Sequence, residues 1–150
     1  MRAVIQRVSK ASVSVKEKTA GSIKQGLVVL IGIENTDDLG DVEWLCNKII
    51  NLRIFPNDEG NMNKCLSEIN GNILLVSQFT LHAKTKKGNR PSFIKAAKPD
   101  VAIPLYQQTI QEFNNKLPQP IETGIFGAMM DVELTNWGPV TLIIDTKNKE

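Results

Sequence analysis

One short stretch, residues 72–81, limits the fold of this chain more than any other. It follows the turn-forming sequence Asn70-Gly-Asn72 and is apolar from Ile73 to Val76. A short, uninterrupted apolar run after a turn is typical of a strand that is buried on both faces. The sequence therefore predicts a central strand here.

The same stretch becomes polar where the apolar run ends, at Ser77, Gln78 and Thr80. If the strand continued to Leu81, alternation would place Ser77, Phe79 and Leu81 on one face and Gln78 and Thr80 on the other. Polar groups at the end of a central strand often face a cleft. A strand that frays into a polar loop would give the same pattern, so both interpretations stay open.

Other β-rich segments predict the remaining strands of a sheet. In the first half they are expected at 2–15 with a bulge near Ser9, at 22–25 after a turn at 16–21, at 27–33, and briefly at 53–55 before a loop at 56–64. In the last third they are expected at 121–126, 130–135 and 140–145, with a hairpin turn at 136–138.

Two segments have the apolar spacing of amphipathic helices. The first runs to Leu52 from Asp41, which we expect to be the N-terminal cap, and the second runs from residue 99 or 100 to about 115. Pro104 is expected in an early turn or at a kink of the second helix. Because strands and helices do not alternate strictly, the pattern predicts an α+β fold: a layered β/β/α sandwich of mixed sheets with two main amphipathic helices.

Length and composition narrow the class of protein. With 150 residues, the chain is expected to form a single domain, 1–150. Cys46 and Cys65 have no metal-binding or redox spacing, and Cys46 lies on the apolar face of the first helix, where we expect it in the core. There is no metal cluster or phosphate-binding glycine loop, so we expect no metal and no cofactor. The absence of a signal peptide or a membrane span predicts a cytoplasmic protein.

A basic segment follows the polar end of the central strand. Between residues 82 and 98 the chain has no acidic residue and six cations: Lys84, Lys86, Lys87, Arg90, Lys95 and Lys98. Such a segment could bind phosphate groups, or it could be a solvated loop. His82 is the only histidine, and no neighbouring acid is present to orient it as a catalytic base.

Four motifs together carry a resemblance to a known family. They are Ser77-Gln-Phe-Thr-Leu81, Gly88-Asn-Arg-Pro-Ser-Phe93, Gly124-Ile-Phe-Gly-Ala-Met-Met130 and Asn136-Trp-Gly-Pro-Val-Thr141. In this order and spacing they resemble the D-aminoacyl-tRNA deacylases, and Val4-Ile-Gln-Arg-Val8 is similar to that family's first strand. The resemblance runs almost from end to end.

The resemblance implies an enzyme that hydrolyses the ester bond of D-aminoacyl-tRNA, and also of glycyl-tRNA, as a proofreading step in translation. It assigns Ser77, Gln78, Phe79 and Thr80 to the catalytic pocket; Gly138, Pro139 and the supporting Arg7 to a loop that excludes L-side chains; and Phe126, Gly127 and Met130 to the terminal adenosine of tRNA. It also implies a homodimer in which the Gly-Pro loop reaches into the partner subunit's pocket. Trp137 departs from the small or acidic residue that many members of the family have.

These residue types agree with ester hydrolysis. An aminoacyl ester is already activated, so the enzyme needs to hold the carbonyl, stabilise its oxyanion and deliver water. Backbone amides near Phe79 and Thr80 are the expected donors, whereas Thr80 as a nucleophile would need a base. The resemblance points to assistance by the ribose hydroxyl of the substrate. Two alternatives remain: a serine or threonine esterase that uses His82, and an RNA-binding module, which would lack the usual clustered aromatics.

Overall fold

A computed structural model describes residues 1–150. Its main sheet consists of β1 (Arg2–Val15), β2 (Lys18–Ile23), β3 (Gly26–Gly32), β6 (Asn72–Ser77), β7 (Glu122–Thr123) and β8 (Asp131–Asp145). The two helices are α1 (Leu39–Asn51) and α2 (Pro99–Lys116), and β4 (Phe55–Pro56) pairs with β5 (Met62–Lys64) in a small hairpin. Two 3-10 turns, η1 (Ser67–Ile69) and η2 (Phe79–His82), complete the regular structure.

The long first strand organises the sheet. Residues 2–8 of β1 pair with β3, whereas residues 11–15 pair with β2, and β8 runs antiparallel to both halves. The pairs of β3 with β6 and of β6 with β7 are parallel, so the sheet is mixed. Because β1 changes partners along its length, the sheet is divided into two layers.

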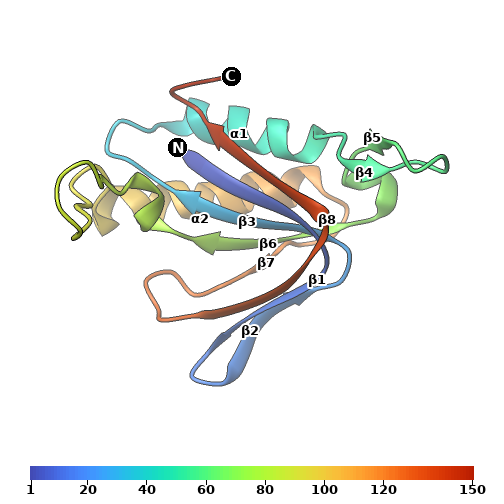
Figure 1. Ribbon diagram of the computed structural model, residues 1–150, viewed down its shortest axis with the longest axis horizontal. Coiled ribbons are helices and arrows are strands. Elements are labelled where there is room, and N and C mark those ends of the chain that lie inside the picture. The colour runs from blue at the N-terminus through green and yellow to red at the C-terminus, as the bar shows by residue number, and fades with distance from the viewer.

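Figure 1 shows α1 on one side of the sheet and the β1–β2 hairpin at the opposite end of the view. Two separate apolar cores hold these layers together. The larger one lies between the helices and the layer formed by β3, β6 and the first half of β1, and it includes Leu45, Ile49 and Phe113. The smaller one lies between the two sheet layers and includes Val8, Val13 and Val28. The predicted α+β fold with helix, sheet and sheet layers is therefore confirmed. Neither helix is long and apolar enough to cross a membrane.

The central strand belongs to both cores. Ile73 and Leu75 of β6 lie in the helix-side core, whereas Leu74 and Val76 lie in the core between the sheet layers. All four side chains are at most 2% exposed. This confirms the strand predicted from the apolar run and explains why that run shows no polar alternation.

The helices form as their apolar spacing predicts, but the first one begins earlier than expected. Asp38, not Asp41, is the N-cap of α1: its side chain accepts a hydrogen bond from Asp41 N, while the Asp41 side chain accepts one from Asp38 N. The prediction of Asp41 as the cap was wrong because both aspartates belong to one capping box. In α2, Pro99 occupies the first turn and Pro104 is accommodated within the helix.

The first predicted hairpin differs in its boundaries from the observed one. The turn between β1 and β2 contains only Lys16 and Glu17, and β2 begins at Lys18, inside the segment expected to be a turn. These two residues take positive φ values of 49° and 64°, a left-handed conformation that a two-residue hairpin turn requires. Two further segments also differ: β7 is limited to 122–123, and β4–β5 lies mostly within the predicted 56–64 loop.

Two other expectations concern segments around the site. Residues 79–82 form η2, so of the two interpretations left open the strand does not continue to Leu81 and the alternation does not apply there. The hairpin at 136–138 does not form either, because β8 is continuous and both of its halves pair with β1. Between the pairs Gln6–Thr141 and Val8–Asn136, residues 137–140 bulge out opposite Arg7.

Candidate active site

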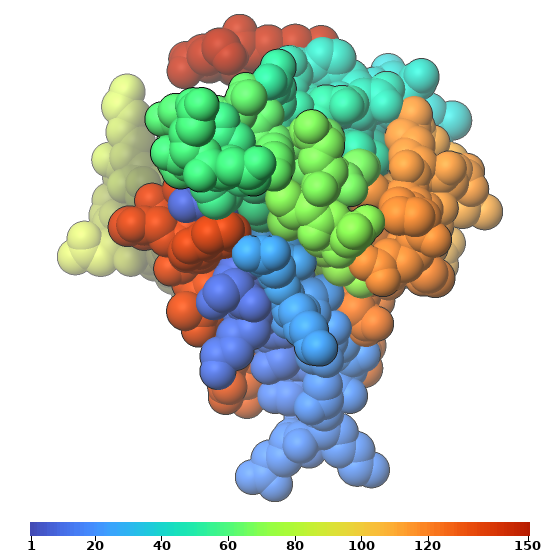
Figure 2. Space-filling model, turned by 90° about the vertical axis from the view of Figure 1, so that its right-hand side faces the viewer, coloured from blue at the N-terminus to red at the C-terminus, as the bar shows by residue number.

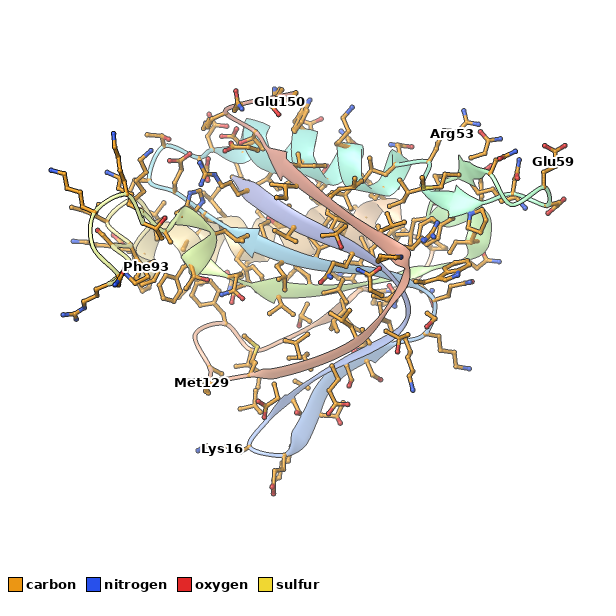
Figure 3. All side chains as sticks on the ribbon, viewed as in Figure 1. Lys16, Arg53, Glu59, Phe93, Met129 and Glu150 are labelled. Carbon is orange, nitrogen blue, oxygen red and sulfur yellow. The ribbon has the colours of Figure 1, made fainter.

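A cavity of about 390 Å³ lies beside the carboxyl end of β6. Its walls come from the ends of β3 and β6, from η2, from the start of α2 and from the segment that leads into β8. The lining residues are Ile31, Ile33, Val76, Ser77, Gln78, Phe79, Ala97, Ala102, Phe126, Gly127, Ala128, Met129, Met130 and Val132. Figure 3 shows Phe93 and Met129 at the same end of the molecule. The cavity is mainly apolar, with its polar groups on one wall.

Parallel pairing explains the position of this polar wall. Because β3 and β6 are parallel, both end at the same edge of the sheet, and Gln78 N donates to Ile31 O at 2.7 Å. Ala97 N, just before α2, donates to Ile33 O at 2.9 Å and brings that segment to the same edge. The small side chains of Ala97 and Ala102 leave room for the cavity.

The η2 turn presents backbone donors at the wall. The first hydrogen bond inside the turn runs from Leu81 N to Gln78 O at 3.2 Å. The N–H groups of Phe79 and Thr80 lie before this bond, so they have no acceptor within the turn itself. The Gln78 side-chain amide donates to the Thr80 hydroxyl at 2.5 Å. Phe79 packs edge-on against Phe93, with 5.1 Å between ring centroids, which connects the turn to the basic segment.

The opposite wall is built on α2. Phe126 lies 5.3 Å from the ring centroid of Tyr106, whose hydroxyl donates to Leu75 O at 3.2 Å. Burial raises the pKa of Tyr106 to about 12, so this phenol keeps its proton and remains a donor. Met130 packs close to the backbone of Gly124, where an added Cβ would lie 2.5 Å from the methionine sulfur.

A second cluster of predicted residues lies outside this cavity. Gly138 and Pro139 are exposed in the bulge of β8, and the peptide bond between them is cis. Arg7, which is 7% exposed, donates from Nε to Trp137 O at 2.8 Å and from Nη1 to Ile54 O at 2.5 Å. Within one chain, therefore, the bulge and the cavity are separate.

Sequence comparisons decide the family. The family described as D-Tyr-tRNA(Tyr) deacylase matches residues 4–145. The chain belongs to the D-aminoacyl-tRNA deacylases. Relatives named D-aminoacyl-tRNA deacylase include one from Cytophaga hutchinsonii, 61% identical, and one from Bacteroides fragilis strain YCH46, 58% identical, and each alignment covers 100% of both chains. The deacylase resemblance inferred from the motifs is confirmed, and the chain is an ester hydrolase of this family.

Solved structures agree with the deacylase fold. A structure titled "c-Myc DNA Unwinding Element Binding Protein" superposes with a TM-score of 0.91 at 37% identity, covering 97% of this chain and 98% of that one. A probable eukaryotic D-amino acid tRNA deacylase superposes with a TM-score of 0.79 at 18% identity, over 95% of this chain and 97% of that one. At that identity, the second likeness supports the fold alone.

The residues that the deacylase resemblance assigned to the pocket are mostly brought together. Ser77, Gln78 and Phe79 line the cavity, and so do Phe126, Gly127 and Met130, which come from a segment about fifty residues later. Thr80 is not a lining residue and reaches the wall only through its bond to Gln78. The catalytic and binding roles of all these residues stay predictions.

Sequence reasoning missed several lining residues of this cavity. They are Ile31, Ile33, Val76, Ala97, Ala102, Ala128, Met129 and Val132. In the sequence, Ile31 and Ile33 cannot be distinguished from ordinary core residues of a strand. The alanines carry no functional group that would indicate a binding site. Met129 is 90% accessible in the loop before β8, but exposure is visible only in the structure and gives no signal in the sequence.

Two candidate reactive groups lie outside the deacylase pocket. Cys46 is fully buried, and burial raises the pKa of its thiol to about 12, which agrees with the predicted core role. His82 is 1% exposed, does not line the cavity, and neither ring nitrogen has a hydrogen-bond partner in the protein. A base must reach the proton that it removes, so this geometry argues against the His82-dependent esterase.

His82→Leu is expected to leave deacylation nearly unchanged and to keep or raise stability. Leucine fills a similar volume, and it removes an unpartnered buried polar ring, whose burial costs about 1–3 kcal/mol. Initial rates on a D-aminoacyl-tRNA and the urea midpoint would be measured together. A large fall in kcat with an unchanged midpoint would restore His82 as a catalytic residue.

Proposed function

We propose that the cavity is the site where the ester bond of D-aminoacyl-tRNA, and of glycyl-tRNA, is hydrolysed to free tRNA and amino acid. The observation that carries this proposal is the position of the cavity: in a chain of the deacylase family, a mainly apolar pocket of about 390 Å³ is lined by Ser77, Gln78 and Phe79 at the end of the central strand. Aminoacyl-tRNA is used in the cytoplasm, and we expect the enzyme there. No cofactor is expected to take part.

The apolar part of the cavity suits the terminal adenosine of tRNA. Phe126 offers a ring face, Met130 a polarisable side chain, and Gly127 a site without a side chain, all on one wall. An adenosine held there would direct its esterified ribose toward the η2 turn. The basis for this placement is the separation of the apolar wall from the polar one.

The polar wall supplies the chemistry. The N–H groups of Phe79 and Thr80 are suited to stabilise the oxyanion that forms when water attacks the ester carbonyl. Gln78 and Thr80, which bond to each other, position the carbonyl and the water. No side-chain base is available at this wall, so the free ribose hydroxyl of the substrate next to the ester assists the water. The ester C–O bond breaks, and the released ribose oxygen takes up the proton from water.

The Gly138–Pro139 bulge acts as the chiral filter, and it acts in trans. Both residues are exposed and are absent from the cavity of their own chain. In a symmetric dimer, each bulge can enter the partner's cavity and present a side-chain-free wall that blocks L-side chains. Exposed apolar residues agree with such an interface, notably Ile143 on β8, which is 77% accessible.

The function is tested by comparing D-, L- and glycyl-tRNA as substrates for the wild-type protein. Rapid hydrolysis of the D- and glycyl esters with negligible hydrolysis of the L-ester is expected. Equal hydrolysis of D- and L-esters would refute the chiral filter. A D-aminoacyl-tRNA whose terminal ribose lacks the neighbouring free hydroxyl should be cleaved much more slowly. Cleavage at the normal rate would exclude the substrate-assisted route.

The dimer is tested by light scattering and by subunit mixing. A protein that is fully active as a monomer would contradict action in trans. In the mixing test, a variant altered in the bulge is combined with one altered at Gln78. Mixed dimers should regain one intact site, which combines the normal bulge of one subunit with the normal pocket of the other.

The basic segment 82–98 is proposed to bind the phosphates near the 3′ end of tRNA. It begins at His82, the last residue of η2, and Phe93 packs against Phe79 at the cavity. Lys84 and Ser92 exchange two backbone hydrogen bonds, of 2.8 and 3.0 Å, which close a loop that carries Lys86, Lys87 and Arg90, all exposed. Figure 2 shows this yellow-green segment projecting from one side, well away from the blue β1–β2 tip.

Replacing Lys86, Lys87 and Arg90 with glutamine is expected to weaken tRNA binding and to lower the slope of log K against log salt by about two to three. The matched control replaces Lys16, Lys18 and Lys24, which are three exposed cations on or beside β2 (Lys16 is labelled in Figure 3). The control should leave the slope nearly unchanged. Equal slopes for both triple variants would show that the 82–98 segment is a solvated loop that does not bind tRNA phosphates.

A further inference from the structure

Arg7 is buried without an acidic partner. Its side chain is 7% exposed, and it takes part in none of the ion pairs in the structure. Burial lowers the pKa of its guanidinium from the usual range. A buried cation without a counter-ion is costly, so other groups must compensate its charge. Two carbonyl oxygens do so in part, those of Trp137 and Ile54.

The ring of Trp137 provides the remaining compensation. The guanidinium carbon lies 4.6 Å from the centroid of this ring, within the range of a cation–π interaction. Trp137 therefore contacts Arg7 twice, through its ring face and through its carbonyl oxygen. The ring also packs against the helix-side core, which fixes its orientation.

The guanidinium in turn touches the exposed part of the bulge. A Cβ at Gly138 would lie 2.8 Å from Arg7 Nη2, so the two groups are in close contact. The base of the bulge is closed by Asn136, whose Oδ1 accepts from Val140 N at 2.8 Å and whose Nδ2 donates to Thr141 Oγ1 at 2.9 Å. Asn136 fixes the two ends, while Arg7 supports the middle.

We propose that Trp137 is a specificity-determining positioning residue: its ring packs on the Arg7 guanidinium and thereby holds Gly138 and Pro139 in the position in which they exclude L-side chains. This inference rests on the proposed role of the bulge as a chiral filter. Trp137 acts through Arg7 and does not touch the substrate. Without the ring, the guanidinium keeps only its bonds to the Trp137 and Ile54 carbonyl oxygens, and its support of the bulge weakens.

The test compares Trp137→Leu, which removes the π face, with Trp137→Phe, which keeps one. Trp137→Leu is expected to lower the ratio of D- to L-ester hydrolysis by about tenfold or more, mainly by raising the L-rate, and Trp137→Phe should recover most of the ratio. Trp44→Leu is the matched control. Trp44 is also half-buried and has a lysine over its ring, Lys149 at 4.4 Å, but it lies on α1. It should leave the ratio unchanged.

A double-mutant cycle shows whether the effect passes through Arg7. In an Arg7→Met background, Trp137→Leu should change the D/L ratio much less than in the wild type. Melting temperatures are measured for every variant, because a purely structural role would lower stability and leave the ratio of the folded enzyme as it is. An unchanged ratio in folded Trp137→Leu, or failure of Trp137→Phe to recover it, would overturn the inference.

The same experiment separates this inference from the function on which it rests. If Pro139→Ala lowers the D/L ratio while Trp137→Leu does not, the bulge is the filter and Trp137 does not position it. If neither substitution changes the ratio, the filter itself is misassigned.

Discussion

Gly138→Ala is expected to remove most of the discrimination between D- and L-aminoacyl esters while the protein remains folded. Gly138 has φ = +138°, a conformation that L-residues rarely adopt, and its added methyl group would lie 2.8 Å from Arg7 Nη2 and 2.9 Å from Val140 Cγ2. Backbone strain of this kind costs about 1–3 kcal/mol. A shift of the exposed bulge would relieve this strain at the lowest cost in free energy. Such a shift would move Gly138 and Pro139 out of the position in which we propose that they exclude L-side chains.

The measurement is the ratio of kcat/KM for D- and L-esters of the same tRNA, for which we expect a fall of at least about tenfold. Gly60→Ala is the matched control, since Gly60 also has a positive φ, +84°, but meets no atom within 4 Å and lies in the β4–β5 hairpin. It should lose a little stability and no selectivity. A wild-type ratio in folded Gly138→Ala would show that the bulge does not select.

Gly26→Ala is expected to have the largest effect on stability of any single methyl addition considered for this chain. A Cβ at Gly26 would lie 1.9 Å from Asn72 O and 2.8 Å from Asn72 N, both of them backbone atoms. Gly26 and Asn72 are the first register pair between β3 and β6, and Asn72 N also donates to Gln25 O at 3.2 Å. The parallel pair that positions the site would have to separate at its start.

We expect a loss of about 3 kcal/mol or more in the free energy of unfolding, the upper end for overpacking a buried position. Urea unfolding followed by circular dichroism measures it, and activity should fall with the folded fraction. Gly60→Ala again serves as the control and should cost about 1 kcal/mol. A midpoint close to that of wild type would mean that β3 and β6 can slide apart cheaply.

The parts of the fold that the sequence predicted are those in which burial leaves a pattern over many residues. The run from Ile73 to Val76 is apolar because each face of β6 meets a different core, and α1 is evident from five buried side chains at helical spacing. Short segments were less secure. Four residues cannot distinguish a 3-10 turn from a strand end or a loop, so both a continued strand and a frayed loop stayed open for residues 79–82.

The strongest local turn signal was misleading for a different reason. Asn136-Trp-Gly-Pro has the composition of a hairpin turn, but β1 is long enough to pair with the chain on both sides of it, and tertiary pairing overrides the local preference. The segment 77–80, to which we assign the catalytic role, was recognisable because its residues are consecutive. Ala97 and Ala102 were not recognisable, because they contribute to the cavity only through their small size, which leaves room for it.

The sharing of β6 between two cores has a consequence for hydrogen exchange. Neither core can open without releasing two of the four apolar side chains that precede Ser77, so we expect no partial unfolding event that loosens one layer and leaves the η2 turn in place. The amides of β6 should therefore exchange with solvent only through complete unfolding. As long as the dimer persists, heat should accordingly abolish activity at the temperature at which the whole molecule melts.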